Sequence, residues 1–105
     1  MLRREEVEAA LRRLKKVIAE IRTENPERAA GAAPAWARQL NAAAALLRSC
    51  GGLEDELDEL SVIAKGIQAE AEEGTPTFRT LARWAKLLDN TVQEIALAAL
   101  GREEV

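Results

Sequence analysis

The stretch RAAGAAPAWARQLNAAAALL, residues 28–47, shows most directly how this chain folds. Ten of its twenty residues are alanine, and Gly31, Pro34 and Trp36 stand among them. Its apolar residues recur every three or four positions, a spacing that predicts one buried helix face made of Ala29, Ala33, Trp36, Leu40, Ala43, Leu47 and Cys50. Alanine is the smallest apolar side chain, so we ask what fills the space around it.

Composition indicates one folded, soluble domain over residues 1–105, with 48% hydrophobic and 31% charged residues. The chain has no histidine and only one cysteine. This removes the Ser-His and Cys-His catalytic pairs, the ordinary haem ligand and cysteine-cluster metal sites. We therefore expect no catalytic residues, no metal and no cofactor. The net charge of −3 disfavours nucleic acid as a partner, and no apolar run approaches the roughly 20 residues of a membrane span.

Helix-breaking and helix-capping residues divide the chain into four segments. Asn25-Pro26, Gly51-Gly52, Gly74-Thr75-Pro76 and Gly101 mark the boundaries, and they predict helices at about 5–24, 26–50, 53–73 and 76–100. Each segment carries an apolar stripe at helical spacing, and the last one places Phe78 beside Leu81, Trp84, Ala85, Leu88, Val92 and Ile95. Short connections between such helices predict an all-α, up-down-up-down antiparallel four-helix bundle.

Pro34 has two interpretations within the second helix. It lacks the backbone N–H that a helix interior uses, so it either kinks the helix or begins its main part after a short separate turn. Both interpretations place an interruption at the level of the alanines. A bowed helix would widen the bundle there.

The two tryptophans are predicted to lie in nearly the same layer of the bundle, surrounded by small side chains. Either the helices approach closely across the alanines, or the alanines line a pocket with a tryptophan on each side. The pocket interpretation gives a ligand site with an apolar wall of Trp36, Trp84, Ala33, Leu40, Ala43, Ala64, Leu81, Ala85 and Leu88. Polar side chains at its edge would be Gln39, Gln68 and Asp89.

The chain resembles de novo designed four-helix bundles of the small-molecule-binding kind. The resemblance rests on four near-equal segments, minimal loops, a densely charged exterior and alanines around two tryptophans. It implies a rigid scaffold shaped around one drug-like aromatic ligand, which stacking and a few hydrogen bonds hold. We expect the protein to be a monomer. The outward-facing Val62 and Leu97, the free Cys50, and the interruptions at Pro34 and Gly66 depart from an idealised design and would suit a natural helical domain equally well.

Three function classes follow from these patterns. The first is a protein that binds a planar aromatic small molecule in the bundle core between Trp36 and Trp84. The alternative is a ligand-free structural or protein-interaction bundle, which the outward Val62 and Leu97 favour. The third is an enzyme that abstracts a proton with Asp89 as base, which requires that carboxylate to be desolvated beside a ligand. A solvated position for Asp89 is the interpretation we prefer.

Overall fold

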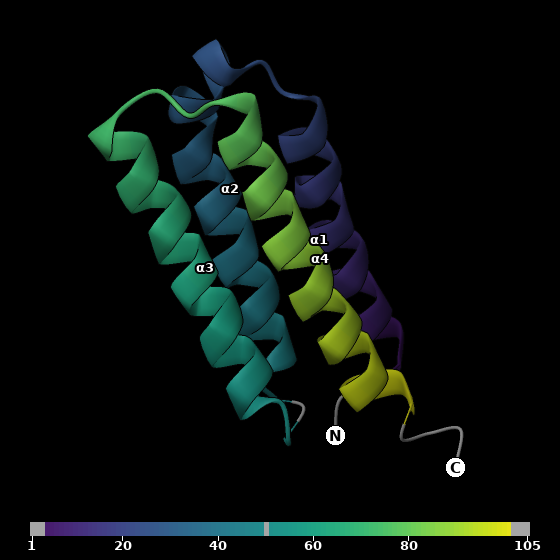
Figure 1. The fold of residues 1–105 in the computed structure, drawn as a ribbon. Coiled ribbons are helices and arrows are strands. Elements are labelled where there is room, and N and C mark those ends of the chain that lie inside the picture. Colours follow the sequence, from purple (N-terminus) through teal and green to yellow (C-terminus); the bar gives the residue numbers. More distant parts are fainter. Residues whose placement is uncertain (1–3, 50, 102–105) are drawn as a thin grey trace.

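The computed structural model describes residues 4–49 and 51–101, and these form four helices. They are α1 (Arg4–Thr23), α2 (Pro26–Leu47), α3 (Glu54–Glu73) and α4 (Phe78–Leu100). Figure 1 shows the helices side by side with alternating direction. The α1–α2 and α3–α4 connections lie at one end, and the α2–α3 connection lies at the other. The predicted all-α, up-down-up-down four-helix bundle is confirmed.

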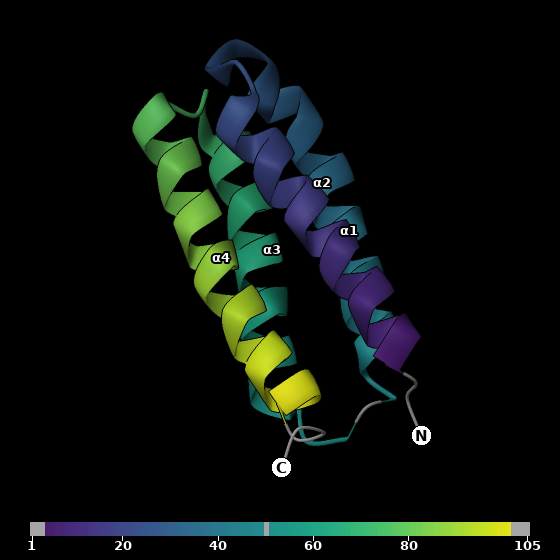
Figure 2. The same cartoon turned by 90° about the vertical axis from the view of Figure 1, so that its right-hand side faces the viewer.

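The helices form a closed ring in which each packs against its two neighbours. The four seams are α1–α2, α2–α3, α3–α4 and α1–α4. Figure 2 shows the same elongated bundle from a second side, and its extents are 44 × 19 × 18 Å. The α1–α4 seam therefore joins the first and last helices of the chain, and residues far apart in the sequence meet there.

The start of α2 agrees with its predicted capping signal. Asn25 has extended backbone angles, and its side chain accepts a hydrogen bond of 3.0 Å from the backbone N–H of Glu27. Pro26 occupies the first helical position, where its missing N–H costs nothing. Pro34 lies inside α2, which is assigned as one helix from Pro26 to Leu47. The interpretation that the main part of this helix begins at Pro34 is therefore wrong.

Two predicted helix boundaries need correction. The fourth helix begins at Phe78 and not at residue 76, because Thr77 is the capping residue and its hydroxyl accepts a hydrogen bond of 3.1 Å from the backbone N–H of Thr80. The second helix ends at Leu47 and not at residue 50, because the chain turns there toward α3. Gly52 completes that reversal with a φ of 94°, which glycine adopts readily. Cys50 lies outside the described residues.

The predicted apolar stripes converge on one core, with a correction at Phe78. This side chain is 75% exposed, because it lies on the side of α4 that also carries the exposed Ala82 and Lys86. Val62 and Leu97 face outward, as predicted, with 68% and 73% of their surfaces exposed. Thr91 is fully buried, and its hydroxyl donates a hydrogen bond of 3.1 Å to the backbone carbonyl of Leu87.

Candidate small-molecule groove between α1 and α4

Both tryptophans are buried, and each donates its indole N–H to a glutamate of the preceding helix. Trp36 Nε1 lies 3.2 Å from Glu20 Oε2, and Trp84 Nε1 lies 2.7 Å from Glu70 Oε2. Each indole is only 2% exposed. The polar edge of each tryptophan is thus satisfied within the protein, and each pair ties together the two helices of one hairpin.

The direction of helical side chains explains these two pairs. In an α-helix, side chains slant toward the N-terminus of their own helix. Glu20 and Trp36 lie on antiparallel neighbours, with Glu20 nearer to the connection, so their side chains slant toward each other. Glu70 and Trp84 repeat this arrangement on α3 and α4. Sequence reasoning missed both glutamates; the signal was an acid shortly before each predicted turn and a tryptophan shortly after it.

Glu70 also receives a hydrogen bond from Arg83, whose Nη2 lies 2.5 Å from the same Oε2 atom. The hydrogen bond from Arg83 holds the pKa of the Glu70 carboxyl below its ordinary value of 4.5, and the bond from Trp84 acts in the same direction, while partial burial opposes both. The same contact raises the pKa of Arg83. Glu70 therefore stays charged over the neutral and mildly acidic range.

The apolar residues predicted to line a ligand site all lie in the single core of the bundle. Each has 3% or less of its surface exposed: Ala33, Trp36, Leu40, Ala43, Ala64, Leu81, Trp84, Ala85 and Leu88. Neither tryptophan lines any of the four best-formed surface hollows of the described residues. A ligand between Trp36 and Trp84 stays a prediction.

The seam between α1 and α4 contains two adjoining hollows, which we call the α1–α4 groove. The larger has a volume of about 480 Å³ and is lined by Arg22, Phe78, Leu81, Ala82, Ala85, Lys86, Asp89 and Asn90. The smaller has a volume of about 260 Å³ and is lined by Lys15, Ile18, Ala19, Arg22 and Asp89. Arg22 and Asp89 line both hollows, so the two adjoin at this ion pair.

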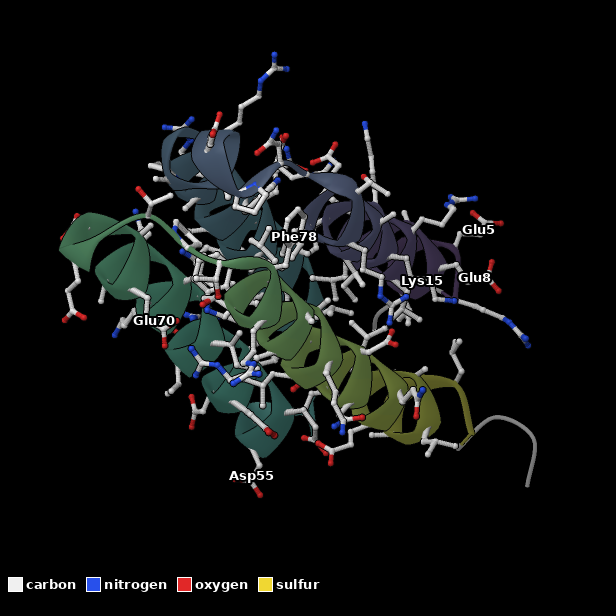
Figure 3. All side chains as sticks on the ribbon, turned by 45° about the horizontal axis from the view of Figure 1, so that its top comes forward. Glu5, Glu8, Lys15, Asp55, Glu70 and Phe78 are labelled. Atoms are coloured by element: carbon white, nitrogen blue, oxygen red, sulfur yellow. The ribbon has the colours of Figure 1, made fainter. Side chains whose placement is uncertain are left out.

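The α1–α4 groove combines an exposed aromatic ring, an apolar floor and polar groups at its edge. Phe78 lies at the start of α4, close to the α3–α4 connection (Figure 3). Leu81 and Ala85 follow it along the helix and form the floor. Arg22 Nη2 donates a hydrogen bond of 2.7 Å to Asp89 Oδ2 across the seam. This arrangement suits an apolar ligand that carries a few hydrogen-bonding substituents.

The three predicted polar site residues do not converge on one site. Asp89 lies in the α1–α4 groove with 39% of its side chain exposed, which agrees with the solvated position that we preferred for it. Gln39 lies in a different groove, between α1 and α2, and Gln68 is half-buried on α3. Of the twelve predicted site residues, only Leu81, Ala85 and Asp89 share a groove. Sequence reasoning missed the contributions of Phe78, Arg22 and Lys86 to it.

Comparisons with protein-family models, with curated proteins and with solved structures find no match for this chain. None of the described helices is long and apolar enough to cross a membrane. Over the same described residues, no group of three or more acidic or cysteine side chains could hold a metal ion. The candidate site therefore rests on the geometry of the α1–α4 groove alone.

Proposed function

We propose that this protein binds a planar aromatic small molecule, and that the α1–α4 groove holds it. The observation that carries the proposal is the position of Phe78, which is 75% exposed next to a hollow of about 480 Å³ with an apolar floor. Small-molecule sites are concave, mostly apolar and within roughly 300–1,000 Å³. The resemblance to designed small-molecule-binding bundles supports the same class of function.

The groove also suggests what the ligand carries besides its ring. Lys86 lies at its edge without an ion-pair partner among the described residues, and Asn90 offers an amide beside it. Arg22 and Asp89 neutralise each other across the seam. An acidic or hydrogen-bond-accepting substituent on the aromatic ring would therefore suit the groove best.

The experiment is a fluorescence titration with the aromatic sulfonate 8-anilinonaphthalene-1-sulfonate. We expect saturation at one equivalent, and we expect Phe78→Ala to weaken binding by about 2- to 12-fold, which corresponds to the energy of one aromatic pair. Leu97→Ala is the matched control, because Leu97 is equally exposed on the same helix but lies outside the groove. Equal losses in both variants, or titration without saturation, would contradict the proposal.

The same titration separates the groove from a site between the tryptophans. Trp36→Phe and Trp84→Phe keep a large aromatic side chain in the core, and they remove an indole that a core ligand would stack against. A ligand in the α1–α4 groove should lose affinity in Phe78→Ala and keep it in both tryptophan variants. The opposite pattern would place the ligand in the core.

A ligand-free interaction bundle is the second candidate function, and exposed apolar side chains favour it. Val62 on α3 and Leu97 on α4 are 68% and 73% exposed. Exposed apolar groups of this kind mark protein contacts when they form a contiguous patch. Sedimentation of the protein with and without Val62→Ser and Leu97→Ser tests this candidate, since only an interaction surface would change its assembly state.

A further inference from the structure

The seam between α1 and α2 contains a second groove, separate from the α1–α4 groove, and we propose that it binds an oligophosphate group. Its volume is about 620 Å³, and its lining residues are Ala9, Arg12, Arg13, Lys16, Ala35, Arg38, Gln39 and Ala42. Four of these side chains are cationic and none is acidic. The proposal does not depend on the aromatic ligand, because the two grooves share no residue.

The four cations have no ion-pair partners among the described residues. Elsewhere among the described residues some exposed cations are paired, namely Arg4, Arg22 and Arg83, and others, such as Arg28, Arg79 and Lys86, are not. The four groove cations differ from these in being grouped: Arg12 and Lys16 stand one turn apart on the same side of α1, where two like charges destabilise a helix. Arg38 adds a third positive charge from α2. A bound anion would relieve the repulsion between these charges.

Small side chains leave room for such an anion. Ala9 on α1 and Ala35 and Ala42 on α2 form the apolar part of the lining, so the cationic side chains surround open space. Two acids lie on this side of α1, Glu8 one turn before Arg12 and Glu20 one turn beyond Lys16. Glu8 pairs with Arg4, and Glu20 accepts the indole N–H of Trp36. Cations that line a concave surface concentrate their field within it.

An oligophosphate matches the number and geometry of these donors. Arginine presents a planar fork that binds two phosphate oxygens at once, and three arginines stand in the groove with one lysine. The Gln39 amide supplies one further N–H donor. A lone carboxylate would leave most of these charges unpaired, whereas a triphosphate engages all four. The groove has no aromatic lining residue on which a nucleobase could stack, so the phosphates are the recognised chemistry.

The test is a calorimetric titration of the protein with inorganic triphosphate, at an ionic strength of about 50 mM to limit screening. We expect one equivalent to bind. Arg12→Gln and Arg38→Gln should each weaken binding by about two- to fivefold, as expected for exposed ion pairs. Arg28→Gln and Arg79→Gln are matched controls, because they remove the same charge outside the groove. They should leave the affinity within about twofold.

Ala42→Leu tests the groove itself, since it fills space without changing charge. Ala42 is exposed, so the larger side chain does not disturb the core. Loss of triphosphate binding in this variant supports a built site. Equal losses in the control arginine variants, an unchanged affinity in Ala42→Leu, or the absence of saturable binding would overturn the proposal.

Two further measurements test whether a nucleoside contributes to binding and whether a second copy of the chain occupies the groove instead. Equal affinity for inorganic triphosphate and ATP shows that the phosphates alone are recognised, and tighter ATP binding shows that a nucleoside adds contacts; both outcomes support the site. The rival occupant is the acidic α3 of a second copy, on which Asp55 projects from the outer surface (Figure 3). Salt-sensitive self-association that Arg12→Gln and Arg38→Gln abolish, without triphosphate binding, would overturn the proposal in favour of that contact.

Discussion

Glu70 is the residue whose surroundings most clearly differ from those of an ordinary surface carboxylate. One of its oxygens accepts hydrogen bonds from both Arg83 and Trp84, whereas Glu20 on the other hairpin accepts one from Trp36. The Arg83 contact lowers the pKa of Glu70 and raises the pKa of Arg83. The charged form of Glu70 is therefore favoured in the folded protein relative to the unfolded chain.

The first stability prediction concerns Glu70→Gln and its dependence on pH. The charge of Glu70 stabilises the fold fully above the ordinary carboxyl pKa of 4.5, and this contribution is lost as the pH falls through the lower folded value. We expect Glu70→Gln to lower the free energy of unfolding by about 0.5–1 kcal/mol at pH 7, a figure reduced for partial exposure. The difference from wild type should shrink toward pH 3, as measured by urea denaturation.

Arg83→Gln is the matched variant for this experiment, because it removes the same ion pair from the other side. Its destabilisation should follow the same pH dependence, while the Trp84 N–H keeps its glutamate acceptor. A destabilisation by Glu70→Gln that is equally large at pH 3 would show that the ion pair is not its cause.

Side-chain partners are the part of this structure that the sequence did not predict. Helical periodicity identified both tryptophans as core residues, and both are buried. Their hydrogen bonds depend on how far one helix is shifted along its neighbour, and on the rotamer that each glutamate adopts. Neither quantity is encoded in the spacing of apolar residues. The Arg22–Asp89 pair spans 67 residues and depends on the same unknown shift.

At the scale of single elements, the start of α4 provides the sharpest test. Thr77 caps the helix through its hydroxyl, so Thr77→Ala should lower the free energy of unfolding by about 1 kcal/mol. Thr75→Ala is the matched control, and it should change stability by less than about 0.5 kcal/mol. Thermal or urea denaturation of the two variants measures the difference. A larger loss of stability in Thr75→Ala would instead indicate that α4 begins at residue 76, as the sequence pattern predicted.

Helix existence and order followed from the sequence, but two helix ends did not. Asn25-Pro26 was identified correctly as the start of α2, because a capping side chain directly before a proline indicates a single first residue for the helix. In Gly74-Thr75-Pro76-Thr77 two threonines compete for the same role, and the spacing of apolar residues does not distinguish them. The backbone decides, since Thr77 is the residue whose hydroxyl reaches the N–H three positions later.

At the scale of the whole molecule, the alanines of α2 decide how tightly the bundle closes. Ala33 is completely buried, so we expect Ala33→Leu to strain the core and lower the free energy of unfolding by about 1–3 kcal/mol. Ala45→Leu on the exposed side of α2 is the control, with an expected change within about 0.5 kcal/mol. Denaturant midpoints measure both. A stabilised Ala33→Leu variant would instead indicate empty volume beside Trp36, as the pocket between the tryptophans requires.

The fold was predictable because its determinants are periodic, whereas the candidate groove was not. Four apolar stripes and short connections leave few arrangements other than an antiparallel ring of helices. The α1–α4 groove depends on Phe78, which its spacing grouped with the core and the structure places at the surface. Phe78 lies one turn before Ala82 and two turns before Lys86, both exposed, so it belongs to the edge of the apolar stripe and not to its centre.

The tryptophan–glutamate pairs also bear on how the chain reaches its native state. Glu20 and Trp36 are 16 residues apart, and Glu70 and Trp84 are 14 apart, so each contact closes a short loop within one hairpin. Arg22 and Asp89 close a loop of 67 residues. Because closure entropy grows with the logarithm of loop length, the long contact costs about 1 kcal/mol more to form from an open chain. The α1–α4 groove thus lies on the seam whose contacts have the higher entropic cost of formation. This cost falls once the two hairpins already pack against each other along the α2–α3 seam.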